Sequence, residues 1–341
     1  MSRGPLSLMV ALVVCLGVSL FGENFIASNF AYYYDILITI GINIILATSL
    51  NLVNGYTGQF SLGHAGFMAI GAYASGSWSN HLDPVIFGVL GGPTNPLATN
   101  VGLFISMFFA GVLAAIAGFA VGVPSLRLKG DYLAIVTLGF GEIIRVAILN
   151  TDFLGASRGL SVIGSYTNLF WTYGSVVLCI YVVLGLVHST YGRGFLTVRD
   201  DEVAAEAMGI NTTKYKVLAF VVASFFAGIA GALYAHFKAF ITPEGFNFFR
   251  SVDIVVIVIL GGMGSTVGVT VAAILLTILP EGLRALAHTQ FVPPAYQGLL
   301  ENRLILYSLL LITLMLTRPQ GLFGDRTASK KRFVRSRGTD G

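Results

Sequence analysis

The residues that could carry out chemistry in this 341-residue chain are few and widely separated. Its five histidines form no H-E-x-x-H motif and no other close metal-ligand spacing, and neither Cys15 nor Cys179 has a C-x-x-C partner. The sequence also lacks a G-x-x-x-x-G-K-[S/T] phosphate-binding loop and a G-x-S-x-G nucleophile motif. We therefore expect no metal, no cofactor and no catalytic residue in this chain, and an intramembrane enzyme is the least favoured class.

Charged residues inside apolar segments point to packing rather than to proton transfer. Glu142 and Arg145 are three residues apart, so on a helix they share a face and are expected to form a structural ion pair. Asp253 opens a short segment after Arg250, where a place at the membrane interface explains it. A proton-driven transporter would need an unpaired carboxylate within the membrane, and we find no clear one. This weakens the hypothesis of a stand-alone secondary transporter or channel.

A polar stretch over residues 51–64 interrupts the apolar sequence. Its amides, hydroxyls and imidazole would be costly facing lipid, so they must bond to one another, to backbone, to water or to a partner subunit. Two interpretations stay open: the stretch lines a gate or pathway, or it is a turn with Ser61 capping the next helix. The residues assigned to the pathway or gate are Asn51, Asn54, Gln59, His64, Tyr132, Gly262 and Gly264.

The composition shows which elements must position these residues. Hydrophobic residues make up 55% of the chain and charged residues only 11%, against about 25% charged in soluble globular proteins. The mean hydropathy is +0.81. These values exclude a water-soluble enzyme, a disordered scaffold and a disulfide-stapled secreted module. The bilayer is the natural solvent for this chain.

A membrane helix needs about 20 mostly apolar residues, and about ten segments approach that length. They lie near 6–22, 34–53, 63–79, 101–123, 132–150, 170–190, 215–238, 252–262, 266–287 and 303–317. A membrane barrel would alternate apolar and polar residues, whereas a run such as 101–123 is apolar on every face. We predict an all-α, polytopic membrane helical bundle with about ten transmembrane segments.

Glycines divide into two groups. Gly118 with Gly122 and Gly228 with Gly231 are expected to let helices approach closely, which is how helices gain packing energy in lipid. The clusters at 55–66 and 261–268 also contain polar residues and should break their helices. Broken backbone at membrane depth is tolerated only where protein or a water-lined cavity covers it.

The distribution of Lys and Arg predicts the orientation. Residues 318–341 hold seven basic and two acidic residues, and this basic tail accounts for the net charge of +4. Such a run beside a hydrophobic helix predicts a cytoplasmic membrane anchor rather than nucleic-acid binding. Basic residues also fall at 127–129 and 193–216, whereas the loop expected over 80–100 has none and should lie outside. Ten crossings then place both termini in the cytoplasm, with segment 6–22 retained rather than cleaved as a signal peptide.

The connection over residues 191–214 contains a well-delimited short helix. Asp200 or Asp201 can cap its start, and Gly209 can end it. Val203, Ala204, Ala207 and Met208 would form a small apolar face, and Glu202 and Glu206 an acidic edge. A helix this short is marginal in water, so something must hold it. We expect it to dock on a soluble partner rather than to lie on the membrane surface, because its acidic edge suits anionic lipid poorly.

Several stretches resemble a known family. Residues 199–211 (RDDEVAAEAMGIN) resemble the cytoplasmic EAA-type coupling segment of ABC importer permeases. Residues 49–73 (SLNLVNGYTGQFSLGHAGFMAIGAY), 130–145 (GDYLAIVTLGFGEIIR) and 259–268 (ILGGMGSTVG) resemble the LivM-type permeases of branched-chain amino acid transporters. The resemblance covers about residues 35–325 in the same order and spacing. It implies an inner-membrane complex with a sister permease of LivH type, two ATPase subunits that bind ATP and Mg, and a periplasmic binding protein that delivers leucine, isoleucine or valine.

The resemblance also implies a domain organisation and a coupling site. Residues 1–30 would form an N-terminal membrane helix and outer loop, 31–323 the permease domain, and 324–341 a basic cytoplasmic tail. The implied coupling residues are Arg199, Asp200, Asp201, Glu202, Ala205, Glu206 and Gly209. The sequence around Gly209 is shorter than the general E-A-A-x-x-x-G pattern, which leaves the ATPase contact residue open. Related permeases carry urea or short amides, and the quoted motifs alone do not exclude such a cargo.

Overall fold

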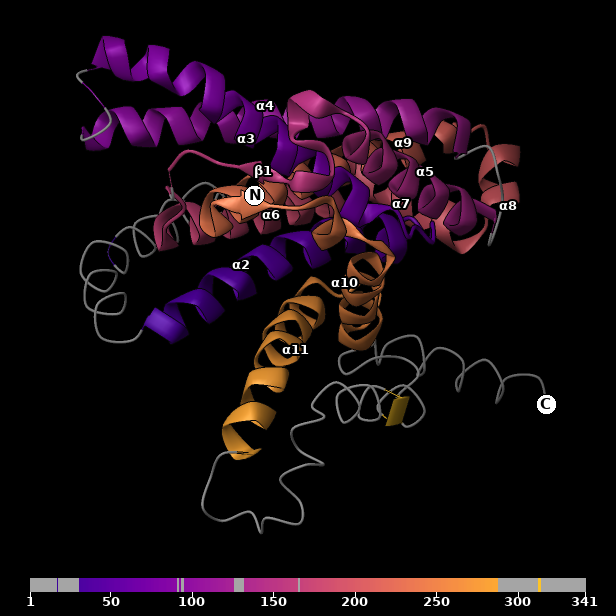
Figure 1. Ribbon diagram of the computed structural model, residues 1–341. Coiled ribbons are helices and arrows are strands. Elements are labelled where there is room, and N and C mark those ends of the chain that lie inside the picture. Colours follow the sequence, from indigo (N-terminus) through magenta and orange to yellow (C-terminus); the bar gives the residue numbers. More distant parts are fainter. Residues whose placement is uncertain are drawn as a thin grey trace, which may run out of the picture.

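A computed structural model of the chain describes residues 17, 31–90, 92, 95–125, 132–164, 166–287 and 312–313 (Figure 1). The segments expected at 6–22 and 303–317, the N-terminal region 1–30 and the tail 324–341 lie outside this part or are barely touched by it. Nearly all the described residues are helical, so the prediction of an all-α membrane bundle is confirmed.

Long helices make up most of the described chain. They are α2 (Ala31–Asn51), α3 (His64–Leu90), α4 (Pro96–Ser125), α5 (Tyr132–Leu149), α6 (Leu169–His188), α9 (Thr212–Lys238) and α11 (Thr266–Ala287). The shorter elements are η1 (Leu52–Tyr56), η2 (Asp152–Leu154), η3 (Ala156–Arg158), β1 (Leu160–Ser161), α7 (Thr190–Asp200), α8 (Glu202–Ala207), β2 (Phe240–Ile241), η4 (Pro243–Phe246) and α10 (Phe248–Gly261).

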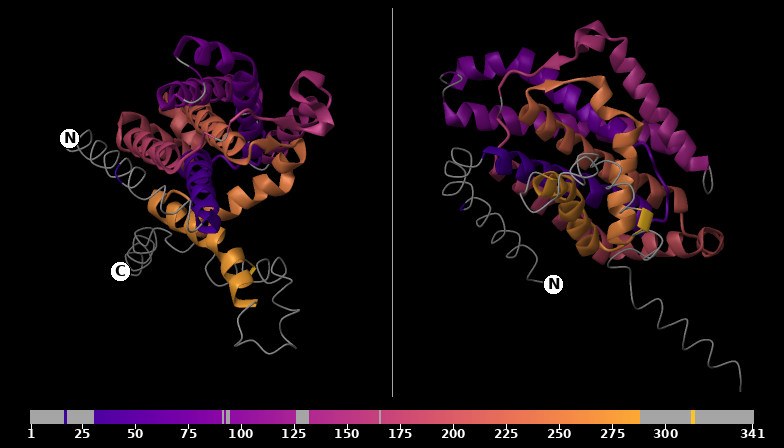
Figure 2. Two further views of the ribbon diagram at one scale, coloured as in Figure 1. Left: turned by 60° about the vertical axis from the view of Figure 1, so that its left-hand side comes forward. Right: turned by 60° about the horizontal axis from the view of Figure 1, so that its bottom comes forward.

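Helices α2 and α9 form the centre of the bundle. Helix α9 packs along α3 and α4, while α2 contacts α6, α9, α10 and α11. Ile38, Ile45 and Leu46 of α2 are fully buried. Helices α10 and α11 lie at the edge of the bundle, as Figures 1 and 2 show, and both contact α2.

Five helical stretches of the described chain are long and apolar enough to cross a membrane. They are Tyr32–Tyr56, Pro96–Ser125, Tyr132–Leu149, Leu169–His188 and Thr212–Lys238. A shorter apolar stretch, Thr266–Gly282, falls below that length. The prediction of about ten crossings is therefore not confirmed, although a polytopic bundle is.

Glycines let the central helices approach one another closely. A Cβ at Gly228 would lie 2.6 Å from the Ala110 carbonyl oxygen, one at Gly231 would overlap the Met68 carbonyl, and one at Gly118 would overlap the Ser224 hydroxyl. Close approach of this kind is how helices pack where the surrounding solvent is lipid. The predicted packing role of these three glycines is confirmed.

The prediction of a loop over residues 80–100 is wrong for most of that range. Helix α3 continues to Leu90 with Pro84 inside it, and α4 begins at Pro96. Pro84 lacks an N–H for the Asn80 carbonyl but does not stop the helix. The Asn80 side chain instead ties this part of α3 to the next region: its Nδ2 donates to the Ser161 carbonyl at 2.7 Å, and its Oδ1 accepts from Ile163 N at 2.9 Å.

The two ends of the bundle differ. At one end, which we call the ribbon end, β1 pairs antiparallel with β2, with Leu160 opposite Ile241. At the other end, the α8 end, the connection between α6 and α9 folds into α7 and α8. The expectation of one short helix over 191–214 is incomplete, because residues 190–200 form a second helix.

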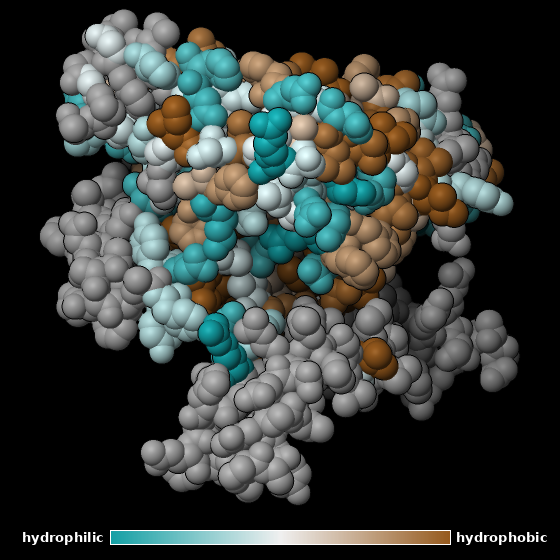
Figure 3. All heavy atoms as spheres, in the orientation of Figure 1, coloured by the Kyte–Doolittle hydropathy of each residue, from teal (hydrophilic) through white to brown (hydrophobic). Residues whose placement is uncertain are grey.

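The surface carries large exposed apolar side chains, as a membrane protein requires. Phe104, Phe108, Ile135 and Ile143 are each more than half exposed. Figure 3 shows hydrophobic side chains over much of the right-hand surface, where α5, α7 and α9 lie in Figure 1, with hydrophilic side chains near the β1 segment. Such a surface suits lipid or partner subunits rather than water.

Candidate functional site

Helix α8 has a well-formed cap at each end. Asp201 Oδ1 accepts a hydrogen bond from Ala204 N at 3.0 Å, so Asp201, rather than Asp200, is the N-cap. At the other end Gly209 has φ +79°, and Ile210 N donates to the Ala205 carbonyl at 3.0 Å. This is the Schellman arrangement, which favours glycine at the left-handed position. Local sequence therefore determines both ends of the helix, as predicted.

The inner side of α8 is held by its own chain. Ala205 is fully buried, and Glu202 pairs with Lys216 of α9 at 2.6 Å, where the Lys216 side chain is only 2% exposed. Glu206 Oε1 accepts from Thr212 Oγ1 at 2.8 Å. The acidic edge expected on α8 is thus used to attach the helix to α9, and these contacts supply the support that so short a helix needs.

The outer side of α8 is apolar and accessible. Met208 is 83% exposed and Val203 66% exposed, and Ala204 and Ala207 are exposed beside them. We call these four residues the outer face of α8. Small side chains around two larger apolar ones form a shallow surface that a groove on a partner protein can accept.

Helix α7 positions α8 and was missed by the sequence analysis. Ser189 caps it by accepting from Tyr191 N at 3.1 Å. Phe195 is fully buried and meets the Tyr215 ring edge-on, with ring centroids 6.0 Å apart. The spacing of Tyr191, Phe195 and Val198 is i, i+4, i+7, which is the helical signal that could have identified α7 from sequence.

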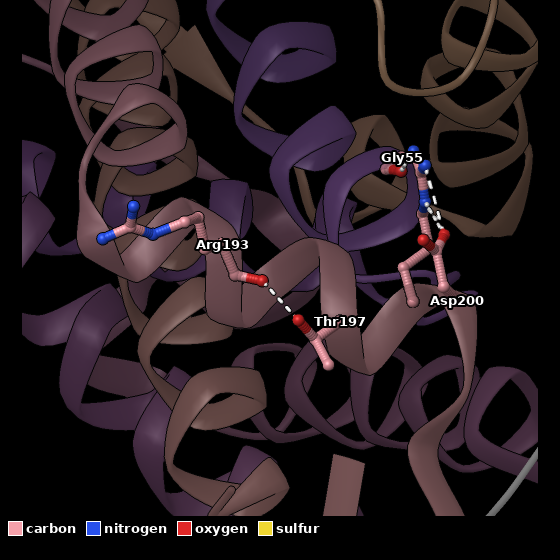
Figure 4. Close-up of polar contacts among 5 residues, drawn as sticks. Gly55, Arg193, Thr197 and Asp200 are labelled. Atoms are coloured by element: carbon pink, nitrogen blue, oxygen red, sulfur yellow. Dashed lines mark hydrogen bonds and ion pairs between the residues drawn. The ribbon is translucent and has the colours of Figure 1, made fainter. Parts of the chain in front are cut away.

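The last turn of α7 reaches the broken segment of α2. Arg199 Nη1 donates to the Gly55 carbonyl at 3.4 Å, and Arg199 Nη2 lies 3.4 Å from Asp200 Oδ1. Figure 4 shows Arg193 and Thr197 along α7, with Asp200 at the end of that helix and Gly55 nearby. Gly58 has φ +68°, and a Cβ there would lie 2.9 Å from Arg199 Cγ. Arg199 and Asp200 therefore contact this chain itself at the α8 end.

Two broken helices meet where Arg199 reaches them. The π-helical turn η1 follows α2, and Gly264 N donates to Asn51 Oδ1 at 2.9 Å. Gly262 and Gly264 have φ +96° and +86°, so the turn between α10 and α11 uses a conformation that favours glycine. Tyr56 Oη and Thr266 Oγ1 lie 2.9 Å apart. We call η1 together with residues 262–265 the broken-helix joint.

The other residues assigned to the pathway do not contact Gly264: Asn54, although part of η1, and Gln59 and His64 make local hydrogen bonds, and Tyr132 lies elsewhere. Asn54 Oδ1 accepts from Ser61 N at 3.1 Å, and His64 Nε2 lies 2.9 Å from Ser49 Oγ. Gln59 Nε2 donates to the Thr57 carbonyl at 3.4 Å. Tyr132 is 71% exposed at the start of α5. The structure thus brings Asn51, Gly262 and Gly264 together, whereas Asn54 and His64 tie neighbouring turns and Tyr132 stands separately.

Two further polar contacts lie among the helices. Arg145 Nε donates to Glu142 Oε2 at 2.8 Å, so the pair forms as its spacing predicts. His236, which sequence analysis did not assign, is fully buried and its Nε2 lies 2.9 Å from Ser75 Oγ and 3.2 Å from Ser79 Oγ. Serines four residues apart on α3 were the available signal. Within the described residues, no group of three His, Cys, Asp or Glu side chains could hold a metal ion.

The fold and the site together define a class of protein. Long apolar helices with a glycine-rich joint, and a capped helix with an accessible apolar face, are features of a polytopic membrane transport component. The chain belongs to the family described as branched-chain amino acid transport system / permease component, whose model matches residues 32–315.

Named relatives agree with this assignment. The chain is 33% identical over 323 residues to the high-affinity branched-chain amino acid transport system permease protein LivM of Salmonella typhimurium, covering 84% of this chain and 69% of the relative. It is 34% identical to LivM of Escherichia coli with the same coverage. It is 28% identical to a probable LivM of Methanocaldococcus jannaschii, covering 85% and 93% of the two chains. No solved structure matches.

Proposed function

We propose that this chain is the permease subunit of a binding-protein-dependent ABC importer and that α8 receives the work of ATP hydrolysis from a partner ATPase. The observation that carries the proposal is the outer face of α8: an apolar, accessible surface on a helix fixed to α9 from behind. Because α8 is attached to α9 on one side, a partner that displaces its outer face would also displace α9.

The route of transmission follows contacts already described. Movement of α8 is passed to α9 by the Glu202–Lys216 pair and to α7 by the chain itself. Helix α7 moves with α9 because Phe195 packs against Tyr215. Arg199 at the end of α7 then displaces the broken-helix joint, which departs from regular α-helix and contains two residues at positive φ. Such a joint is a natural place for a change of conformation.

The proposed orientation places the α8 end in the cytoplasm and the ribbon end in the periplasm. Basic residues at the α8 end, Arg193, Arg199 and Lys214, support this by the positive-inside rule. The partners are a sister permease of LivH type, two ATPase subunits that carry ATP and Mg, and a periplasmic substrate-binding protein. The chain itself would carry no ATPase site, and both termini would be cytoplasmic in the inner membrane.

The proposed cargo is a branched-chain amino acid, because the family and the LivM relatives are named for that transport. A relative named for another cargo is a reason to test it: an autoinducer 2 import permease, LsrC of Yersinia pseudotuberculosis, is 25% identical over 53% of this chain. A urea or short-amide permease is the alternative within the same family, and a stand-alone secondary transporter the alternative outside it.

A charge on the outer face of α8 tests the docking claim. Met208→Glu should reduce co-purification of the ATPase subunits and lower ATP-driven uptake of leucine into proteoliposomes by about tenfold, because a carboxylate would be desolvated in an apolar contact. Thr197→Glu, an exposed position on α7, is the matched control and should leave both measurements near wild type. Full uptake and normal co-purification of the Met208 variant would remove the docking claim. Uptake by the chain alone, driven by an ion gradient, would favour a secondary transporter.

A further inference from the structure

A pocket of about 230 Å³ lies between α2, α10 and α11, away from α8. Its volume is below the range of about 300–1,000 Å³ that is typical for drug-sized ligands, so it suits a smaller molecule. Its lining combines one cation, one anion and two neutral polar groups with an aliphatic wall. That combination is unusual on a face built from apolar helices, where charged groups are costly and mark functional sites.

The cation of the pocket is held in a fixed position. Arg250 Nη2 donates to Asn43 Oδ1 at 2.9 Å, and Asn43 Nδ2 donates to Thr277 Oγ1 at 2.8 Å. One contact to an amide leaves the other guanidinium N–H groups to be satisfied. Within the described residues, no carboxylate forms an ion pair with Arg250. Arg250 is partly buried, and a guanidinium in such surroundings is stabilised by a nearby anion.

The anion of the pocket lies one helical turn further along α10. Asp253 is three residues after Arg250, so the two side chains share a face of the helix, and both line the pocket. Within the part of the chain that the structure describes, no ion pair joins them, so Asp253 is an exception to the expectation that the apolar segments carry no unpaired carboxylate. A cation and an anion that face one space without pairing match a zwitterion, whose carboxylate and ammonium groups are a fixed short distance apart.

The wall of the pocket is aliphatic. Ile254 and Ile257 of α10 and Leu276 of α11 line it and are almost fully buried. Pro280 lies within α11 and also lines the pocket. Because proline has no N–H, the Leu276 carbonyl lacks its helical donor and is available to accept from an ammonium group.

We propose that this pocket is a transient binding site for the cargo amino acid within the membrane. Arg250 binds the carboxylate, Asp253 and the Leu276 carbonyl bind the ammonium group, and Ile254 and Ile257 contact the branched side chain. The proposal rests on the proposed function and deepens it, since it places substrate recognition in the permease as well as in the binding protein. The pocket lies between α2 and the α10–α11 pair, which are the helices that the broken-helix joint connects, so movement of the joint would open or close it.

Direct binding to the purified transporter complex, without its binding protein, tests the site. The probes are labelled leucine, 4-methylpentanoate, which lacks the ammonium group, and isopentylamine, which lacks the carboxylate. Arg250→Gln should weaken the binding of leucine and 4-methylpentanoate at least about tenfold and leave the binding of isopentylamine unchanged. Asp253→Asn should weaken the binding of leucine and isopentylamine and leave the binding of 4-methylpentanoate unchanged. The matched controls are Arg158→Gln and Asp152→Asn, exposed positions at the ribbon end. Unchanged binding of all three probes in both pocket variants would overturn the proposal.

Assembly and function are checked in the same preparations. Co-elution of the subunits on size exclusion shows that a variant is folded. Should Arg250→Gln fail to assemble, Asp253→Asn decides, because Asp253 is an exposed side chain and its isosteric change leaves the packing intact. Failure of the wild-type complex to take up leucine with ATP and binding protein would refute the proposed function. Normal uptake together with unaltered probe binding in the variants would refute only the pocket.

Discussion

Helix α8 and the broken-helix joint lie at the same end of the bundle but are held by different kinds of contact. Helix α8 is defined by residues next to it in the sequence, since Asp201 caps its start and Gly209 ends it. The joint is held by contacts between distant residues, such as Gly264 N to Asn51 Oδ1, which are 213 positions apart. Local contacts make α8 a preformed, rigid docking element. The non-local contacts of the joint run through small residues, so the two broken helices can separate there.

This difference separates what each region can do. A docking element must keep its shape when a partner binds, and caps with a buried ion pair secure that. A joint must have two arrangements of similar free energy, so glycines and single hydrogen bonds suit it. Mutations should therefore affect partner binding through α8 and the conformational change through the joint.

The largest effect is expected from Glu202→Ala. Lys216 would remain buried at 2% exposure without its carboxylate, which costs about 3 kcal/mol. Hydrogen exchange of residues 201–209 should accelerate and co-purification of the ATPases should fall. The double variant Glu202→Ala/Lys216→Met should recover much of the loss, because no buried charge is left unpaired.

Glu244→Ala is the matched control for that prediction, since Glu244 is exposed at the ribbon end. Slow exchange of 201–209 in Glu202→Ala would mean that the ion pair does not hold α8. Helix α8 would then be no more rigidly held than the joint.

A smaller effect is expected from Gly55→Ala, which acts on the joint alone. The new methyl group would overlap Gly264 N and would lie 3.0 Å from Gly264 Cα, and overpacking of this kind costs about 2 kcal/mol. ATP-driven uptake should fall by about tenfold while the ATPases still co-purify, because α8 is untouched. Measured uptake and pull-down in one preparation separate the two regions.

Gly139→Ala on α5 is the control, because nothing lies within 4 Å of a Cβ at that position. It should leave uptake unchanged. Equal loss of uptake in the two alanine variants would contradict a special role for the joint.

Features that depend on local contacts could be predicted from the sequence, whereas those that depend on distant residues could not. The all-α membrane class, the ends of α8 and the Glu142–Arg145 pair depend on composition or on residues up to a few positions apart, and they were predictable. Pairing of Asn51 with Gly264 was not, because a sequence shows that a buried amide needs a partner but not which distant residue supplies it. Helix α7 was missed although its Tyr191, Phe195 and Val198 have helical spacing, because glycines at 192 and 194 hide that pattern.

The acidic edge of α8 shows the limit for function. Charge alone suggested that Glu202 and Glu206 face a partner, but Lys216 and Thr212, which contact them, begin the next helix. Only the angle between α8 and α9 decides whether a carboxylate points outward or back to its own chain. The exposed apolar residues were predicted correctly because a six-residue helix cannot bury all sides.

The smallest effect is expected from Asp201→Ala, because this change weakens α8 by removing one local contact. Losing the hydrogen bond to Ala204 N should cost about 1 kcal/mol and should raise the exchange rate of the α8 amides about fivefold. Asp200→Ala, one residue earlier, removes a carboxylate that contacts Arg199 and not α8, so exchange in α8 should stay at the wild-type rate. Equal changes of the exchange rate in both variants would mean that the two aspartates share the cap. Helices α7 and α8 would then unfold locally as one unit, and α8 would not be a separate docking helix supported by α7.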